Sequence, residues 1–338
     1  FSRTAKTIKI SKEMQSCFDI VESVLSPNEL MTYILKAEVD LLWNGGIGTY
    51  VKSRVESHLD VSDKANDNIR IDGNELRCKV IGEGGNLGIT QLARIEYSLN
   101  KGVCFTDFID NAGGVNCSDI EVNIKILLNQ LLESGDLNSK SRNTLLRQMT
   151  GAVSKLVLDN NYRQAQAINL MSYQSKRRGQ EYAQLMRSLE EQGKLNRRLE
   201  FLPNEEELQE RGARGESLTA PELAILASYV KGILKQDLTN TDLVENDYIA
   251  KEMRDAFPQI LTKKYPNALS EHRLKRELVA TQLANGMIDY IGMIFVTRMK
   301  ESTGASTAEV AKSYIVARDV FALEDRWREI SDLDYKVD

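Results

Sequence analysis

Short apolar segments, followed by glycine-rich loops and helical patterns, dominate the first 135 residues of this sequence. The apolar segments occupy residues 39–43, 77–82 and 102–108, and helical patterns follow at about 90–101 and 117–132. A repeated order of strand, loop and helix with short connections is typical of a parallel sheet in an α/β domain. The sequence therefore predicts an α/β fold for residues 1–135.

The glycine-rich loops lie near residues 45, 84 and 113, where we expect turns at the ends of the three predicted strands. Parallel sheets bind their ligands beyond the carboxyl ends of the strands. We expect all three turns to fall on that edge, which is therefore the predicted ligand site.

From about Ser139 onward the sequence shows helical periodicity and no strand pattern. Capping-box sequences predict helix starts at residues 26–29, 219–222 and 306–309. A stretch rich in glycine and charge at residues 209–218 predicts a loop. We expect an all-α helical domain over residues 136–338, after the α/β domain of residues 1–135.

Composition narrows the class of protein. The 338 residues carry 44 Lys and Arg against 49 Asp and Glu, and this net charge of −5 argues against nucleic acid as a partner. No apolar stretch approaches the roughly 20 residues that cross a bilayer, so no membrane partner is expected. Four cysteines without a CxxC pair favour a reducing, cytoplasmic compartment, and two isolated histidines predict no metal site. The first residue is Phe1, and we expect the chain to be part of a longer polypeptide.

The loop at residues 82–88 has the layout of a phosphate-binding loop without its spacing. A dinucleotide fingerprint places glycines at relative positions one, three and six, and here Leu87 occupies the sixth position. Glu83 and Asn86, set among glycines at the end of a strand, indicate either a ligand lying close to the backbone or a carboxylate that favours the next helix start. The loop at residues 44–50 is open to two interpretations as well, a ligand cradle or a plain turn.

Residues 110–119 bring polar side chains to both sides of a glycine pair. Asn111 can donate and accept hydrogen bonds, and Ser118 can bind an anion near a helix start or simply cap that helix. Asp107 lies about twenty residues beyond the first glycines, which is where a ribose-binding acid is expected; the irregular glycine spacing disfavours that role.

Taken together, these segments resemble the NAD-dependent glutamate dehydrogenases of the large bacterial type, in the order DLLWNGGIGTYVK, KVIGEGGNLGITQ and DNAGGVNCSDIEVNIKI. Ordinary glutamate dehydrogenases read EGAN and NAGGV at the corresponding places, with a serine shortly after. Here the motifs stand at residues 83–86 and 111–115, followed by Ser118, and Gly85 replaces the alanine. In the second half, LTAPELAILASYVK and ELVATQLANGMIDYIG resemble the C-terminal region of the large type.

The resemblance implies a fold and an activity. The fold is a partial Rossmann-like doubly wound domain over residues 1–135, the C-terminal part of an NAD-binding domain, followed by the helical C-terminal domain over residues 136–338. The activity is oxidative deamination of L-glutamate to 2-oxoglutarate and ammonia by hydride transfer to NAD, in a full-length enzyme that forms a homo-oligomer.

The resemblance also implies roles for individual residues. Gly84 and Gly85 let the cofactor approach the backbone, and Asn86 and Asn111 lie beside the nicotinamide and its ribose. Ser118 contacts the side-chain carboxylate of the substrate.

The catalytic lysine and aspartate of the family precede the cofactor domain and have no counterpart here, so we expect no catalytic residue in this chain. It is then incomplete as an enzyme by itself. Two alternatives remain open. One is a non-catalytic oligomerisation or regulatory module of a larger enzyme. The other is a dehydrogenase for a different amino acid such as leucine, against which Ser118 speaks, because an apolar substrate side chain offers that hydroxyl no carboxylate.

Overall fold

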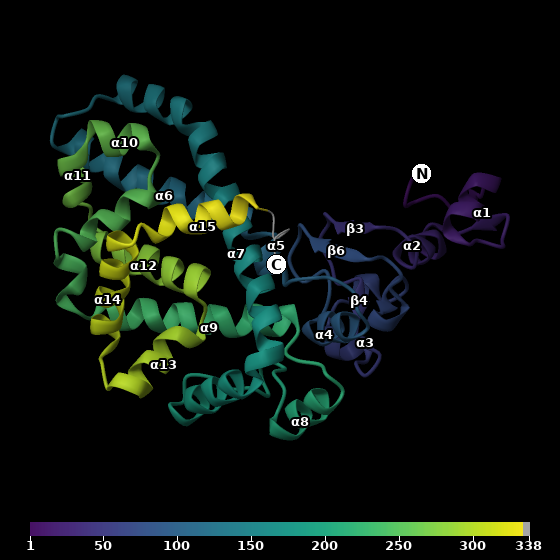
Figure 1. The fold of residues 1–338 in the computed structure, drawn as a ribbon. Coiled ribbons are helices and arrows are strands. Elements are labelled where there is room, and N and C mark those ends of the chain that lie inside the picture. The colour runs from purple at the N-terminus through teal and green to yellow at the C-terminus, as the bar shows by residue number, and fades with distance from the viewer. Residues whose placement is uncertain (334–338) are drawn as a thin grey trace. The chain divides into compact units, whose positions relative to one another are not determined.

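The computed structural model describes residues 1–333, which are mostly helical and contain three small two-stranded sheets (Figure 1). They form two compact units. The first unit comprises Phe1–Ala112, Ser172–Gly179 and Asn196–Ile225, and the second comprises Gly113–Met171, Gln180–Leu195 and the described residues from Leu226 onward. Because the units interleave along the chain, the expected division after residue 135 stays a prediction.

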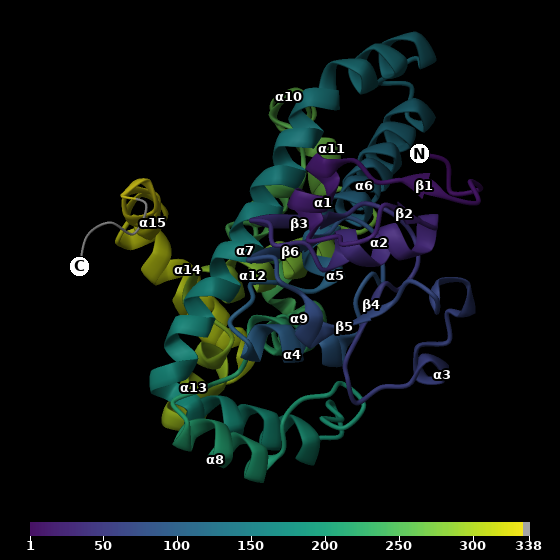
Figure 2. The ribbon, with the colours of Figure 1, turned by 90° about the vertical axis from the view of Figure 1, so that its right-hand side faces the viewer.

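The strands all belong to the first unit: β1 (Ile8–Lys9), β2 (Val24–Leu25), β3 (Leu41–Asn44), β4 (Val51–Lys52), β5 (Ile71–Asp72) and β6 (Val80–Glu83). β1 and β2 pair antiparallel, whereas β3 with β6 and β4 with β5 form parallel pairs (Figures 1 and 2). Single parallel bridges add Val103 beside Val80 and Ile89 beside Val51. The predicted parallel pairing of the segments near residues 41 and 80 is therefore confirmed.

The prediction of a third strand at residues 102–108 is wrong, apart from the position of Val103. Only Val103 forms a bridge, and helix α5 (Asp107–Asp110) begins four residues later. The Thr106 carbonyl oxygen accepts hydrogen bonds from the N–H groups of Ile109 and Asp110, at 3.0 Å each. Asp107 stands at the start of this helix and accepts a hydrogen bond from the Phe108 N–H at 2.9 Å, and this local preference overrides the apolar pattern.

The other helices of the first unit are α1 (Lys12–Phe18), α2 (Pro27–Leu35), α3 (His58–Val61), α4 (Gln91–Leu99), α8 (Glu205–Ala213) and the short 3₁₀ helices η1 (Lys64–Asn66) and η2 (Gly73–Glu75). The helix start predicted at residues 26–29 is confirmed, since Ser26 and Glu29 form a reciprocal capping box. α8 covers the first half of the loop predicted at residues 209–218, because Asn204 and Glu207 cap its start.

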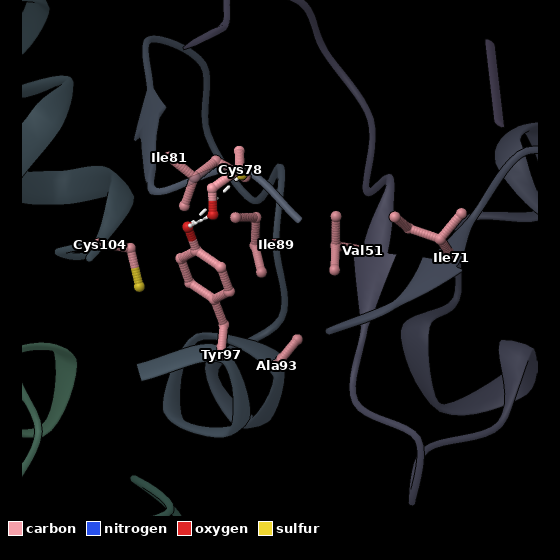
Figure 3. Close-up of a cluster of buried hydrophobic side chains, with 8 residues drawn as sticks. All are labelled: Val51, Ile71, Cys78, Ile81, Ile89, Ala93, Tyr97 and Cys104. Atoms are coloured by element: carbon pink, nitrogen blue, oxygen red, sulfur yellow. Dashed lines mark hydrogen bonds between the residues drawn. The ribbon is translucent and has the colours of Figure 1, made fainter. Parts of the chain in front are cut away.

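The main apolar cluster of the first unit packs α4 against the parallel strands (Figure 3). It comprises Val51, Ile71, Cys78, Ile81, Ile89, Ala93, Tyr97 and Cys104. The Tyr97 hydroxyl donates to the Cys78 carbonyl oxygen at 2.8 Å, which satisfies the one polar atom that this ring brings into the core. Burial raises the pKa of the Cys104 thiol to about 12, so that cysteine is a packing residue.

Helices alone form the second unit, and residues 104–333 contain no strand. α6 (Ala112–Glu133), α7 (Ser139–Glu191) and α9 (Ala220–Thr239) each run across a boundary between the units. The remaining helices are η3 (Asp242–Glu245), η4 (Ile249–Ala256), α10 (Gln259–Lys264), α11 (Pro266–Ser270), α12 (Lys275–Ile291), α13 (Ile294–Thr303), α14 (Thr307–Val320) and α15 (Leu323–Asp332). The helix starts predicted at residues 219–222 and 306–309 are confirmed, the second with a full capping box.

His272 is buried in the second unit between α6 and the start of α12. Its Nε2 lies 3.1 Å from the Asn123 carbonyl oxygen, and its Nδ1 accepts a hydrogen bond from the Leu274 N–H at 3.1 Å. Both ring nitrogens are thus satisfied by the backbone, and burial lowers the pKa of this imidazole. The residue is a neutral structural histidine.

Candidate functional site

The carboxyl ends of β3 and β6 lie side by side, and a glycine-rich loop follows each strand (Figure 1). The strand register pairs Asn44 with Glu83. The Asn44 carbonyl oxygen accepts hydrogen bonds from the N–H groups of Gly84 and Gly85, at 2.8 and 3.2 Å. The prediction that the loops near residues 45 and 84 meet at one edge is therefore confirmed, because backbone hydrogen bonds join them.

The third glycine turn, predicted near residue 113, is wrong. α5 ends at Asp110 and α6 begins at Ala112, so Gly113 and Gly114 are helical and the chain changes direction at Asn111. As a consequence Ser118 is the seventh residue of α6, exposed, and too far along the helix to cap it. The assignment of Ser118 to the substrate then depends on the motif resemblance alone.

Two of the residues predicted to bind a cofactor contact each other. The Asn111 side-chain Nδ2 donates to the Asn86 Oδ1 at 2.8 Å. Asn86 is exposed in the second loop, and Asn111 is half-buried between α5 and α6. This bond orients both amides and leaves the Nδ2 of Asn86 and the Oδ1 of Asn111 as a donor and an acceptor for a ligand.

The glycines of the second loop are surrounded by protein atoms. A Cβ on Gly84 would lie 2.7 Å from the Trp43 ring, and one on Gly85 would overlap the Gly46 carbonyl oxygen. Gly88 is in the same position against the Asn44 side-chain amide. Close approach of the first loop therefore requires these glycines, and it explains why Gly85 stands where the ordinary motif has alanine.

A group of buried charges lies directly beneath the second loop. Arg94 of α4 donates through Nε to Glu83 Oε1 at 2.6 Å and through Nη2 to Glu83 Oε2 at 2.8 Å. The same Nη2 lies 3.4 Å from Asp107 Oδ1. Glu83, which the sequence left as a ligand neighbour or a helix-dipole partner, is instead the partner of a buried arginine.

The carboxylates of this group also accept hydrogen bonds from the backbone. Glu83 Oε2 accepts from the Ile89 N–H at 3.1 Å, and Asp107 Oδ2 accepts from the Leu87 N–H at 2.7 Å. Asp110 Oδ2 accepts from the Glu83 N–H at 3.0 Å. Asp107 is thus occupied as a support for the loop, which leaves the ribose-binding role without a free carboxylate.

Burial controls the protonation of these acids. Burial raises the pKa of Glu83, and the hydrogen bonds and charge of Arg94 oppose that rise. Burial also raises the pKa of Asp110, to about 6, and the charges of Glu83 and Asp107 add to this rise, against a hydrogen bond from the Glu83 backbone and the charge of Arg94. Arg94 therefore opposes the protonation of Glu83 that burial favours, and Asp110 has no arginine donating a hydrogen bond to its carboxylate.

A cavity of about 230 Å³ opens beside the first loop. Mostly apolar side chains line it, among them Leu42, Trp43 and Tyr50, together with Asn44 and Gly88. Within the described part of the chain, the buried Asn44 Nδ2 meets no acceptor. This amide is packed against the Gly88 backbone, so Asn44 contributes to the close contact of the two loops.

Sequence reasoning missed three residues of this site. Asn44 stood in a quoted motif but received no role, although its place directly after a strand was the available signal. Asp110 opened the segment of residues 110–119 but received no role either. Arg94 gave no signal, because a charged residue in an amphipathic helix is usually solvated.

Other kinds of site find no support among residues 1–333. They contain no group of three His, Cys, Asp or Glu side chains that could hold a metal ion. No single helix in that range is long and apolar enough to cross a membrane; α12 and α13 pass the length and composition test only as a pair bent by 92°.

Comparison with known families gives two matches along the chain. Residues 1–171 match the family described as bacterial NAD-glutamate dehydrogenase, catalytic domain. Residues 215–338 match the family described as glutamate dehydrogenase, C-terminal.

Curated relatives match nearly the whole chain. A protein of Pseudomonas aeruginosa named NAD-specific glutamate dehydrogenase is 55% identical over 337 residues, and one of the same name from Halomonas elongata is 51% identical over 337 residues. A third, from Mycobacterium tuberculosis, is 38% identical over 336 residues, or 98% of this chain. In each case the chain covers 21% of the relative, so it spans about a fifth of the length of these proteins.

Proposed function

Because the chain belongs to the bacterial NAD-glutamate dehydrogenase family, we propose that it supplies part of the cofactor and substrate site of such an enzyme. The reaction is oxidative deamination of L-glutamate to 2-oxoglutarate and ammonia. NAD, when bound, supplies the hydride acceptor. This chain contributes binding and orientation, and the catalytic groups come from elsewhere in the longer polypeptide.

The observation that carries the proposal is the hydrogen bond between Asn86 and Asn111 at the carboxyl edge of the parallel strands. A carboxamide ring substituent and a ribose both need donors and acceptors held in fixed directions, and the paired amides provide them. Ser118 is assigned to the substrate carboxylate by family resemblance.

The Rossmann-like fold is part of the same proposal. Leu41 and Trp43 of β3 and Val80 of β6 are exposed, although parallel strands are normally covered on both faces. We therefore infer that these strands belong to a larger doubly wound sheet in the full-length polypeptide. The helical C-terminal domain over residues 136–338 is proposed as a separate domain on the match at residues 215–338.

We also propose a cytoplasmic location and a homo-oligomeric assembly. The four cysteines are unpaired, which supports the reducing cytoplasmic compartment expected from the sequence. The homo-oligomer stays a prediction, and light scattering of the full-length polypeptide tests it.

The second candidate is a non-catalytic module, and the packing of the glycines favours it. Trp43 and Gly46 give Gly84 and Gly85 a structural reason to be glycine that involves no ligand. The two candidates differ in one measurable respect, since only the first requires the chain to contact NAD.

The experiment compares the full-length polypeptide with a variant carrying Asn111→Ala. The unsubstituted protein is expected to reduce NAD when L-glutamate is added, measured by NADH absorbance. Asn111→Ala is expected to raise the KM for NAD about tenfold, because it removes one amide and releases the other. An unchanged KM for NAD in a folded variant contradicts the cofactor assignment and favours the non-catalytic module.

A further inference from the structure

We propose that Arg94 is a positioning residue that holds Asn86 and Asn111 at a fixed separation. It does so by joining Glu83, at the end of β6, to Asp107, at the start of α5. The inference rests on the proposed function, because it concerns how the amides assigned to the cofactor are kept in place.

Arg94, Glu83 and Asp107 are buried together, and this burial restricts how they can move. Arg94 is 4% exposed, Glu83 1% and Asp107 9%. Charges removed from water persist only with close partners, and an uncompensated member costs several kcal/mol. The three side chains come from α4, β6 and α5, so their pairing fixes three separate elements relative to one another.

The carboxylates of Glu83 and Asp107 also hold the loop that carries Asn86, because they accept hydrogen bonds from its backbone. Asp107 faces Arg94 with Oδ1 and accepts the Leu87 N–H with Oδ2. Glu83 binds Arg94 with both oxygen atoms, and its Oε2 also accepts the Ile89 N–H. The second half of the loop is therefore held by acids whose own positions depend on the guanidinium.

Asp107 carries the same constraint to Asn111. Its carbonyl oxygen accepts a hydrogen bond from the Asn111 N–H at 2.7 Å, which closes the last turn of α5. The Asn111 side chain then reaches Asn86 at 2.8 Å. A continuous set of hydrogen bonds and ion pairs thus runs from Arg94 through Asp107 to both amides.

Only an arginine can make these contacts at once. The forked guanidinium presents several N–H groups in one plane, and here Nε and Nη2 bind Glu83 while Nη2 also faces Asp107. A lysine keeps the charge but offers a single compact ammonium group. Arg94→Lys therefore loosens the geometry while it keeps the buried charges balanced.

A second buried ion pair of the same unit provides the control. Arg211 Nη1 donates to both carboxylate oxygens of Glu222 at 2.9 Å, and Glu222 is 0% exposed. In the described structure Glu222 otherwise accepts only from Thr219, and neither partner hydrogen-bonds to the loop at residues 84–88. Arg211→Lys thus disturbs a buried pair of similar burial without touching the amides.

The experiment measures three properties of both variants in the full-length polypeptide: NADH affinity by fluorescence titration, thermal unfolding, and hydrogen exchange at the Leu87 and Ile89 amides. Arg94→Lys is expected to weaken NADH binding about tenfold and to speed exchange at both amides. Arg211→Lys is expected to change NADH affinity less than about twofold at a similar loss of thermal stability. Equal effects of the two variants on NADH affinity and exchange overturn the proposal.

Two further outcomes keep the inference separate from the proposed function. If the unsubstituted polypeptide binds no NADH, the proposed function fails, and hydrogen exchange alone judges whether Arg94 positions the loop. If Arg94→Lys does not fold, Asp107→Asn takes its place, because it breaks the contact at 3.4 Å and leaves the Arg94–Glu83 pair intact. Unchanged NADH affinity and exchange in Asp107→Asn overturn the proposal.

Discussion

Two glycine pairs with nearly the same sequence setting have opposite structures in this protein. Gly84 and Gly85 form a loop after β6, tightly packed against Trp43 and Gly46, whereas Gly113 and Gly114 continue helix α6. A Cβ on Gly85 would overlap a backbone oxygen, but a Cβ on Gly113 would meet only Val157 Cγ1, at 3.7 Å.

A glycine pair therefore does not by itself specify a turn. The first pair follows a strand whose parallel neighbour also ends there, so two loops must share the space beyond the sheet. The second pair follows α5, and a single residue, Asn111, is enough to redirect the chain before α6 begins. The preceding element decides what the glycines do.

The largest effect is expected from Gly85→Ala. Its methyl group overlaps the Gly46 carbonyl oxygen, so the two loops must separate, at a cost of about 3 kcal/mol. Thermal unfolding and NADH titration of the full-length polypeptide measure the loss. Gly212→Ala on α8 is the control, because nothing lies within 4 Å of the added Cβ. Equal behaviour of the two variants would show that the loops are free to adjust, and the contrast between the glycine pairs would weaken.

The next prediction compares Asn86, in the second glycine loop, with Ser118, in helix α6, by the ligand whose KM each substitution changes. Asn86→Ala is expected to raise the KM for NAD about tenfold, and Ser118→Ala to raise the KM for L-glutamate by a similar factor, since each loses one hydrogen bond to a different ligand. Steady-state kinetics of the full-length polypeptide give both constants. Unchanged kinetics in Ser118→Ala remove this serine from the substrate site, while a reversed pattern exchanges the two assignments.

A smaller effect, on the pH dependence of stability, is expected from Asp110, which lies beneath the second glycine loop. Burial raises its pKa to about 6 in the folded protein, above the value of about 3.9 expected when unfolded. The folded state binds this proton more tightly, so the stability that Asp110 contributes is complete below about pH 4 and is lost as the pH rises through 6.

Asp110→Asn removes that dependence. The substitution is expected to increase the free energy of unfolding by about 1 kcal/mol at pH 8, with a smaller gain at pH 5. The amide oxygen of the new side chain can still accept the Glu83 N–H. Thermal unfolding at the two pH values is the measurement. A gain that does not depend on pH would mean that Asp110 is already neutral.

The smallest effect is expected from Gly113→Ala, a gain in stability where Gly85→Ala causes a loss. Gly113 is the second residue of α6, so alanine is expected to add less than the difference of about 1 kcal/mol that holds in a helix interior, and the methyl group would make an ordinary contact with Val157. A slightly higher unfolding temperature with unchanged NADH affinity supports the helical assignment. A loss of NADH or glutamate binding at unchanged stability would show that a ligand needs the bare backbone at residue 113.

The helix starts were readable from the sequence because capping is local. Ser26 with Glu29 and Ser306 with Glu309 satisfy the orphan N–H groups of their own first turns, so no distant residue can change the result. The parallel strands near residues 41 and 80 were readable for a related reason, since apolar runs that precede glycine loops have few other places to be buried.

The site was only half predictable. The motif order brought Asn86 and Asn111 to attention, and the structure joins them with a hydrogen bond. Arg94 escaped notice, because a charged side chain on a helix acquires its meaning only when α4 is packed on β6 and the partner is known. Ser118 was expected at a helix start, and the position of that start depended on α5, which the apolar pattern concealed.

The amino-acid sequence alone was enough to predict which residues cap helices, that the segments near residues 41 and 80 form parallel strands, and which family motifs the chain carries. Those properties depend on neighbours a few positions away or on residue order alone. Three other properties came only from the tertiary structure: Gly85 has no room for a side chain, Glu83 faces Arg94, and burial raises the pKa of Asp110 to about 6. Each of these depends on atoms distant in sequence and on exclusion from water, which exist only once the strands and α4 have packed.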